Sequence, residues 1–271
     1  IIEIISFSDL VKSLNDFIEG HSQAIEKEKL KALGKRNQLY EEIESRAKRE
    51  QELKVLIREK KEELERLIPA LEAIRNRFDI PLSVDTFKSE TAKVAITYGA
   101  DIINDITGFL GDPDMATVVA DNNVGCVLMF NKRTNGDTLP YVDTISVRAV
   151  KELTESINIA KKAGIEDCRI MTDPGIGFGT TRIEDAELSS ALLSLGMQGK
   201  YPVLYAASRK RYVRLFAGGD QATIDQLDHA TAGLSFMAAS VGASMVRVHN
   251  VAASKLALKN FDDTFYAFAN I

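Results

Sequence analysis

The chain has 271 residues, of which 45% are hydrophobic and 27% are charged, and its formal net charge is -5. No apolar run in the sequence approaches the roughly 20 residues that span a bilayer, so we expect an ordinary globular protein and exclude a membrane protein. The net negative charge gives no general attraction for nucleic acid. We therefore expect a small-molecule site in which a few local cations hold any anionic ligand.

The opening residues and the cysteines predict a cytoplasmic protein. The chain begins with Ile1, and its first ten residues lack the basic stretch and small-residue cleavage site of a signal peptide, so we expect a fragment of a longer protein. Cys126 and Cys168 each lie in an apolar stretch, which is typical of buried, reduced thiols.

Residues from about 21 to 77 predict one long helix, because they are mostly Glu, Lys, Leu, Gln and Arg. Apolar residues recur in its second half at alternating spacings of four and three, interrupted only by Lys60: Leu53, Ile57, Leu64, Leu67, Leu71 and Ile74. This spacing is the heptad pattern of a coiled coil. At 1.5 Å per residue the helix would extend roughly 80 Å, so part of it must project or pair with another helix.

Short apolar runs that alternate with helical patterns follow Asp79. We interpret six of them as strands, at residues 80–86, 101–108, 124–130, 169–178, 202–210 and 244–250. Strict alternation of apolar strands with helices predicts a buried parallel sheet. The pattern suits a doubly wound open sheet as well as a TIM-type barrel.

Polar side chains at the ends of these strands favour the barrel, since the carboxyl ends of the strands form the catalytic face of a TIM barrel. They are Asp85, Asn104, Asp173, Lys210, Arg247 and His249. An isolated Asp or Asn at such a place is most often a cap or turn residue, so the prediction depends on the whole set. The acidic and amide members offer the acceptors and donors that match a flat heterocycle such as a pterin. Met129, if it is not simply core, could pack on the ring face.

The cations predict an anion site. Lys210 ends the fifth strand, and Arg247 and His249 end the sixth, which in a complete barrel would be strands seven and eight, where phosphate often binds. Val248 separates Arg247 from His249, so both side chains point to the same side of the strand. Arginine can clamp an oxyanion with two hydrogen bonds, and histidine adds a donor. The alternative is a pair of surface cations.

The glycines at 175, 177 and 179 are not spaced as in a dinucleotide-binding loop, which needs G-x-G-x-x-G opening directly into a helix. We expect instead a loop that approaches a ligand closely, with Phe178 as a lid or stacking group.

Six ordered segments carry a family resemblance: SVDT, INDITG, VLM, DPGIGFG, ASRK and RVHN. From about residue 67 to residue 271 the chain resembles dihydropteroate synthase. Relatives that transfer methyl groups through a corrinoid generally lack the SRK and RVH segments, so the synthase branch is preferred. The resemblance implies an α/β fold of the TIM-barrel (β/α) type, with six recognisable βα units and the first two replaced by the long N-terminal helix or coiled coil.

The resemblance also implies an activity and its residues. The family condenses hydroxymethyl-dihydropterin diphosphate with 4-aminobenzoate and releases diphosphate. The implied catalytic residues are Lys210, Arg247 and His249. The expected pterin site comprises Asp85, Asn104, Met129, Asp173, Lys210 and Arg247. Phe178 and Lys210 border the aminobenzoate, and Arg247 and His249 bind the diphosphate.

Several family features are absent from the sequence. The family implies Mg²⁺ on the diphosphate, but its usual Asn ligand and the Thr-Arg-Pro-type loop that closes over aminobenzoate are not recognisable, so the metal ligands stay unknown. Four residues replace the usual His, Lys, Gly and Asp of the family: Phe130, Thr180, Ala206 and Asn250.

The N-terminal part, from about residue 6 to residue 66, resembles the small coiled-coil subunit of intraflagellar transport. We therefore predict two domains, a coiled-coil segment at 1–66 and a pterin-binding barrel at 67–271. The expected partners are the two small substrates, a second copy of the chain that docks through helices beginning at His229 and Ser254, and a coiled-coil partner. IIEII at residues 1–5 is the one candidate for a replacement strand. The alternative function is a catalytically inactive coiled-coil interaction or fusion protein that retains a barrel remnant.

Overall fold

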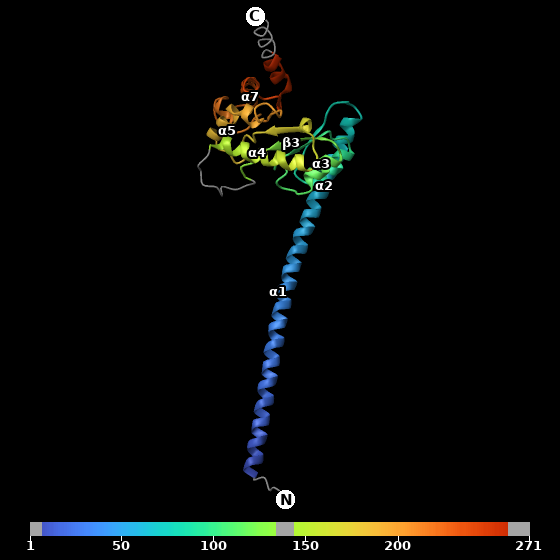
Figure 1. Cartoon of the computed structure of the whole chain (residues 1–271), viewed down its shortest axis with the longest axis vertical. Coiled ribbons are helices and arrows are strands. Elements are labelled where there is room, and N and C mark those ends of the chain that lie inside the picture. Colours follow the sequence, from blue (N-terminus) through green and yellow to red (C-terminus); the bar gives the residue numbers. More distant parts are fainter. Residues whose placement is uncertain (1–6, 134–143, 260–271) are drawn as a thin grey trace. The chain divides into compact units, whose positions relative to one another are not determined.

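The computed structural model describes residues 7–133 and 144–259 (Figure 1). The chain divides into two compact units, residues 1–63 and residues 64–271. The first unit consists, where it is described, of helix, and the second has an α/β fold. The predicted domain boundary between residues 66 and 67 stays a prediction, and the candidate strand at residues 1–5 lies outside the described residues.

Helix α1 (Phe7–Arg75) contains 69 residues, which confirms the predicted long helix. It begins 14 residues before the expected start at His21, because the preceding segment also lacks proline and continues in the same helical composition. Pro69 lies inside the helix, where a proline removes one backbone hydrogen bond. Arg75 fixes the end of the helix by donating from Nε to the Gly99 carbonyl at 2.8 Å.

The last part of the heptad pattern belongs to the second unit, and its apolar side chains pack into the core of that unit. Leu71 is only 4% exposed, and Leu67 and Ile74 are partly buried against the same core. Leu53, earlier in the pattern, is 50% exposed. The apolar pattern is therefore buried at its end around Leu71 and exposed at Leu53.

Replacing Leu71 by alanine is expected to lower the free energy of unfolding of the α/β unit by about 3 kcal/mol, because the change leaves a cavity in a closed core. The matched control on the same helix is Leu53→Ala, which should change the free energy by no more than about 0.5 kcal/mol. Urea unfolding followed by circular dichroism measures both values. Equal effects of the two substitutions would show that Leu71 is not part of the core.

The six predicted strands are confirmed, each shorter than its apolar run. They are β1 (Ser83–Asp85), β2 (Ile102–Asp105), β3 (Gly125–Met129), β4 (Ile170–Asp173), β5 (Leu204–Tyr205) and β6 (Met245–Val246). The intervening helices are α2 (Ser89–Thr97), α3 (Met115–Asp121), α4 (Ile145–Lys162), α5 (Arg182–Ser190), α6 (Leu192–Leu195) and α7 (Ile224–Ser240), with two short 3-10 helices, η1 (Asp167–Arg169) and η2 (Val213–Leu215).

All strand pairs are parallel and follow chain order. Strands β1 to β4 form one sheet in that order, and β5 pairs with β6. A bridge between Thr172 and Val203 joins the two sheets. A doubly wound sheet would reverse its strand order at a switch point, whereas a TIM barrel adds strands in sequence. The observed order therefore supports the barrel type of fold.

The core has an outer and an inner part. Two large clusters of buried side chains involve the helices, one with α2 and α3 and the other with α4 to α7. A small third cluster joins Val127 of β3 to Leu204 of β5 and to Ala206, which directly follows β5. In an eight-stranded barrel such a cluster would fill the interior.

One expectation about the cysteines is wrong. Cys126 is buried, and burial raises the pKa of its thiol to about 12. Cys168 is exposed because it lies in η1, before β4 begins at Ile170. Among the described helices, none has both the length and the apolar content required to cross a membrane.

Candidate functional site

The carboxyl ends of β1 and β2 place Asp85 and Asn104 side by side. They are partners in the strand register, so both side chains lie on the same face of the sheet. Asn104 donates from Nδ2 to Oδ1 of Asp85 at 2.6 Å. Arg247, which follows β6, forms an ion pair with the other carboxylate oxygen of Asp85. The first and last strands of the fold are therefore linked at their carboxyl ends.

Two buried acceptors in this region have no hydrogen-bond partner among the described residues. They are Oδ1 of Asn104 and Oδ2 of Asp173. Both side chains are only 1% exposed. A buried polar atom without a partner costs about 1 to 3 kcal/mol, so these atoms indicate a place for a ligand that donates hydrogen bonds.

The electrostatics tie Asp173 to the cations. Burial raises the pKa of the Asp173 carboxyl, opposed by a hydrogen bond from the Gly175 amide and by the charges of Lys210 and Arg247. Burial likewise lowers the pKa of the Lys210 ammonium, and the charge of Asp173 opposes that effect. The sequence prediction that these strand ends lie together is supported by this mutual influence.

The loop after β4 is shaped by glycine and held by Lys210. Gly175 has φ +69°, and a Cβ atom there would lie 1.7 Å from the Phe130 carbonyl oxygen, so no other residue fits. Lys210 donates from Nζ to the Ile176 carbonyl at 2.7 Å, and the same Nζ lies 4.5 Å from the centre of the Phe178 ring. Phe178 is therefore half-buried and lies beside a cation, and its role as a lid or a stacking group stays a prediction.

A buried aspartate that the sequence interpretation missed supports this loop. Oδ1 of Asp185, in the first turn of α5, accepts from the Gly177 amide at 2.8 Å and from the Thr180 hydroxyl at 2.5 Å. Thr180 stands where the family usually has Lys, and its hydroxyl is used inside the protein. The sequence offered only a weak signal for Asp185, an acidic residue in the first turn of a helix.

The residues predicted to bind an anion line a cavity of about 390 Å³ at the ends of β5 and β6. Its lining residues are Ala206, Ser208, Lys210, Arg247, Val248 and His249. The Ser208 hydroxyl lies 2.9 Å from Nδ1 of His249. The three predicted cationic residues therefore line one cavity whose walls contain no carboxylate.

A second set of contacts joins the loop that follows β5 to the loop that follows β6. Arg209 donates to both carboxylate oxygens of Asp228 in α7, at 2.7 Å and 2.9 Å. Asn250 donates to Asp228 at 3.2 Å. Asn250 stands where the family usually has Asp, and here α7 supplies the carboxylate. No sequence motif pointed to Asp228, because it lies within a helix remote in sequence from both loops.

Replacing Asp228 by asparagine is expected to lower the midpoint of thermal unfolding at pH 7 by roughly 2 to 4 °C, the effect of an ordinary destabilising substitution. Arg209 holds the pKa of Asp228 below its ordinary value of 3.8, aided by Asn250. The stabilisation is therefore present above pH 3.8 and is lost as the pH falls through the lower folded-state pKa. The difference between the two proteins should therefore shrink as the pH is lowered below 3.8, and a difference that grows as the pH falls would contradict this account.

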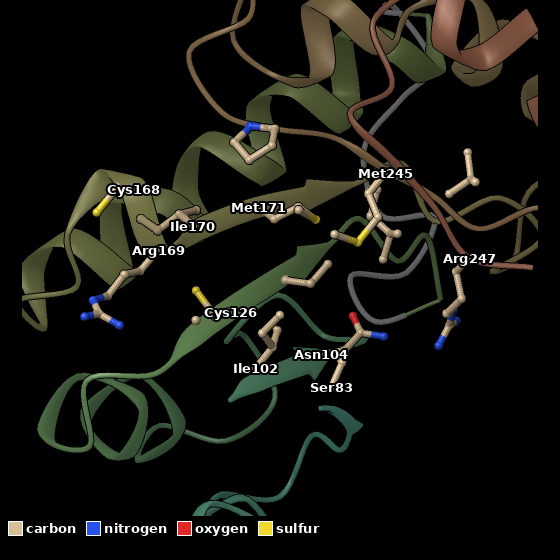
Figure 2. Close-up of a pocket in the computed structure, with 15 residues that line it drawn as sticks. Ser83, Ile102, Asn104, Cys126, Cys168, Arg169, Ile170, Met171, Met245 and Arg247 are labelled. Atoms are coloured by element: carbon tan, nitrogen blue, oxygen red, sulfur yellow. The ribbon is translucent and has the colours of Figure 1, made fainter. Parts of the chain in front are cut away.

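A second cavity, of about 400 Å³, lies along the inner face of the sheet. Figure 2 shows Asn104 and Arg247 at one end of it and Cys168 and Arg169 at the other. Between them its walls are mainly apolar, including Ile102 and Met171. Two of the pterin candidates, Asn104 and Arg247, therefore lie at the carboxyl-end mouth of this cavity, whereas Asp85 and Asp173 are not among its lining residues.

The structure places the remaining predicted residue, Met129, at the end of β3 in register with Asp173. Met129 is buried and lines neither of these two cavities. Its role against a ring face stays a prediction.

Comparison with known proteins identifies the family. Residues 53–249 match the family model described as pterin binding enzyme. Residues 1–77 match the model of intraflagellar transport complex B, subunit 20, so the two matches overlap at residues 53–77. The dihydropteroate synthase of Clostridium beijerinckii is 45% identical over 57% of this chain and 55% of its own length. That of Bacillus subtilis is 38% identical over 70% of this chain and 64% of its own length. The chain thus spans between half and two thirds of these curated relatives.

Solved structures agree in fold. Dihydropteroate synthase of Xanthomonas albilineans, in complex with 7,8-dihydropteroate, superposes with a TM-score of 0.68 at 35% identity, covering 75% of this chain and 74% of that one. The same protein solved with 4-aminobenzoic acid gives the same TM-score and identity. Since the family model covers well over half of the chain and the folds agree, the chain belongs to the family of pterin-binding enzymes that includes the dihydropteroate synthases.

Proposed function

We propose that the chain carries the site of a dihydropteroate synthase, a transferase of folate biosynthesis that joins hydroxymethyl-dihydropterin diphosphate to 4-aminobenzoate and releases diphosphate. The observation that carries the proposal is the pair of buried acceptors without partners, Oδ1 of Asn104 and Oδ2 of Asp173. A pterin ring presents N–H donors along one edge, and these would satisfy both atoms. The relative solved with 7,8-dihydropteroate supports a pterin rather than another heterocycle.

The proposed roles follow from charge and position. Asp85, Asn104 and Asp173 hold the polar edge of the pterin, with Met129 beneath the ring. Arg247 and His249 bind the diphosphate, and Lys210 borders both the pterin and, with Phe178, the aminobenzoate. The catalytic residues are Lys210, Arg247 and His249.

The chemistry needs stabilisation of charge at two places. The aminobenzoate nitrogen forms a bond to the methylene carbon of the pterin while the bond between that carbon and the diphosphate oxygen breaks. The amine loses a proton in the same reaction. Diphosphate leaves with the bonding electron pair, so cations at the ends of β5 and β6 lower the barrier. The acidic groups around Asp173 favour the positive charge that develops on the pterin methylene.

Mg²⁺, which the family implies for the diphosphate, does not fit the described residues. Among them no group of three or more His, Cys, Asp or Glu side chains gathers as a metal site. Asp85, the carboxylate that pairs with Arg247 of the proposed diphosphate site, is already engaged by Asn104 and Arg247. No step above therefore depends on the metal.

The test is a titration of 6-hydroxymethylpterin into the full chain, followed by calorimetry. We expect saturable binding that Asn104→Leu abolishes, because leucine fills the same space without an acceptor. The control is Asn122→Leu, which changes an exposed asparagine at the end of α3. Lack of heat with millimolar pterin would refute the proposal.

One observation favours the second candidate function, a pterin-binding protein without turnover that acts through its coiled coil. Within the described residues, β1 pairs only with β2 and β6 only with β5, and the ion pair between Arg247 and Asp85 occupies two proposed pterin-binding groups. A coupled assay of diphosphate release distinguishes the two candidates. Turnover that depends on 4-aminobenzoate supports the synthase, and pterin binding without turnover supports the alternative.

The homodimer, the coiled-coil partner and the cytoplasmic location remain part of this proposal. Light scattering of the full chain tests the first of them, and a monomer at micromolar concentration would contradict it.

A further inference from the structure

The loop after β5 carries Lys210, and the loop after β6 carries Arg247 and His249. These two cation-bearing loops depend on side-chain contacts for their alignment. Strands β5 and β6 pair over only two residues each, Leu204 with Met245 and Tyr205 with Val246. Beyond them, one backbone hydrogen bond continues the ladder, from the Arg247 amide to the Tyr205 carbonyl at 3.0 Å. His249 lies further along, where its placement depends on Ser208.

We propose that Ser208 is a positioning residue that sets the tautomer of His249. Its hydroxyl donates to Nδ1 of the neutral imidazole, so the ring proton resides on Nε2 and His249 offers an Nε2–H donor to a phosphate oxygen. The identity of the anion rests on the proposed function, whereas the tautomer does not.

The direction of the hydrogen bond follows from the partners of Ser208. Its Oγ accepts from the backbone amide of His249 at 3.2 Å and lies 2.9 Å from Nδ1 of the same residue. The structure gives Oγ no third partner within the described residues, and Ser208 is buried. If Oγ also accepted from an Nδ1–H, its own O–H would have no partner within the described residues, and a polar hydrogen without a partner at a mostly buried site is costly. Donation to Nδ1 satisfies every group.

The consequence for ligand binding depends on which ring nitrogen carries the proton. In a neutral imidazole one nitrogen donates and the other accepts, and the bond made by one decides the state of the other. With Nδ1 occupied as acceptor, Nε2 is the donor. His249 lines the same cavity as Lys210 and Arg247, so the donor adds to two cations where an anion would bind.

The other two histidines provide an internal contrast. The chain has three in all. Nδ1 of His21 lies 3.0 Å from the Phe17 carbonyl oxygen, and Nδ1 of His229 lies 2.8 Å from the Asp225 carbonyl oxygen. A carbonyl oxygen only accepts, so these two rings favour the proton on Nδ1. His249 is expected to show the opposite tautomer.

The decisive experiment is a long-range ¹H–¹⁵N correlation spectrum of the ¹⁵N-histidine-labelled full chain, recorded without ligand at about pH 9, where an ordinary imidazole is neutral. His21→Gln and His229→Gln assign the signals. We expect His249 as the Nε2–H tautomer, a mixture of tautomers in Ser208→Ala, and recovery in Ser208→Thr. An Nδ1–H signal for His249 in the unaltered chain overturns the proposal, and so does an unchanged tautomer in Ser208→Ala.

Binding of inorganic diphosphate, measured by calorimetry, tests the functional consequence. Ser208→Ala is expected to weaken it roughly three- to tenfold, the worth of one ordinary hydrogen bond, and Ser208→Thr to restore it. A changed tautomer with unchanged affinity would overturn the link to anion binding. If the unaltered chain binds no diphosphate, the proposed function loses its anion site, while the spectrum still decides the role of Ser208.

Discussion

Asp173→Asn is expected to abolish pterin binding, by at least about a hundredfold in affinity, while raising the free energy of unfolding at pH 7 by about 1 kcal/mol. The affinity falls because the carboxylate oxygen without a partner is the proposed acceptor for the pterin. The stability rises because asparagine removes a buried charge and keeps an oxygen for the Gly175 amide, which now donates to Asp173 at 2.7 Å.

The stability difference between Asp173→Asn and the unaltered chain should depend on pH. The pKa of Asp173 is raised above its ordinary 3.8 by burial, so its contribution to stability is fully present below pH 3.8 and is lost as the pH rises through the folded-state value. The stability advantage of Asp173→Asn should therefore grow with pH. Urea unfolding at pH 4 and pH 8 measures it, and an advantage that shrinks towards pH 8 would contradict the explanation.

Asp105→Asn is the matched control. Asp105 is also buried, and burial also raises its pKa, but both of its carboxylate oxygens have partners. Oδ1 accepts from the Thr107 amide at 2.7 Å, and Oδ2 accepts from the Phe109 amide at 3.1 Å. Asparagine would place an NH₂ group against one of these donors, so Asp105→Asn should destabilise the chain. A stabilising effect at both positions would show that ligand binding is not the reason for the unsatisfied oxygen of Asp173.

Lys210→Met should reduce kcat/KM at least about a thousandfold, or about 4 kcal/mol of transition-state stabilisation, in the diphosphate-release assay. Methionine keeps most of the volume but loses the Nζ that contacts Ile176 and Phe178. Lys200→Met is a close control, since Nζ of Lys200 also lies over an aromatic ring, 5.0 Å from the centre of Tyr201, but on the surface. We expect that control to retain full activity.

The ionisation of Lys210 predicts the alkaline limit of the reaction. Because burial lowers the pKa of Lys210 below its ordinary 10.5, the protonated form is lost as the pH rises through a value below 10.5. We therefore expect kcat/KM to fall over the same pH range. Lys210→Arg, which stays charged, should move this fall to higher pH. If the fall in kcat/KM stays at the same pH in Lys210→Arg, the titrating group is a residue other than Lys210.

Much of the candidate site could be predicted because its residues lie at the carboxyl ends of parallel strands. Asp85 and Asp173 end β1 and β4, and Asn104 is the last residue but one of β2. The carboxyl ends of parallel strands in a barrel converge. Asp228 and Asp185 could not be found in this way. Both are polar residues on helices, where surface exposure is the ordinary expectation, and only tertiary packing shows that they are buried beneath the site.

The sequence by itself determined the long helix, the parallel βα alternation, the family and the set of strand-end residues, because periodicity and strand-end position are local properties of the chain. The tertiary structure decided which part of the heptad pattern packs on the α/β unit, that Cys168 is exposed, and that Ser208 and Asp228 hold the two cation-bearing loops together. These outcomes depend on contacts between segments distant in sequence, such as Ser208 with His249, and no local pattern encodes such contacts.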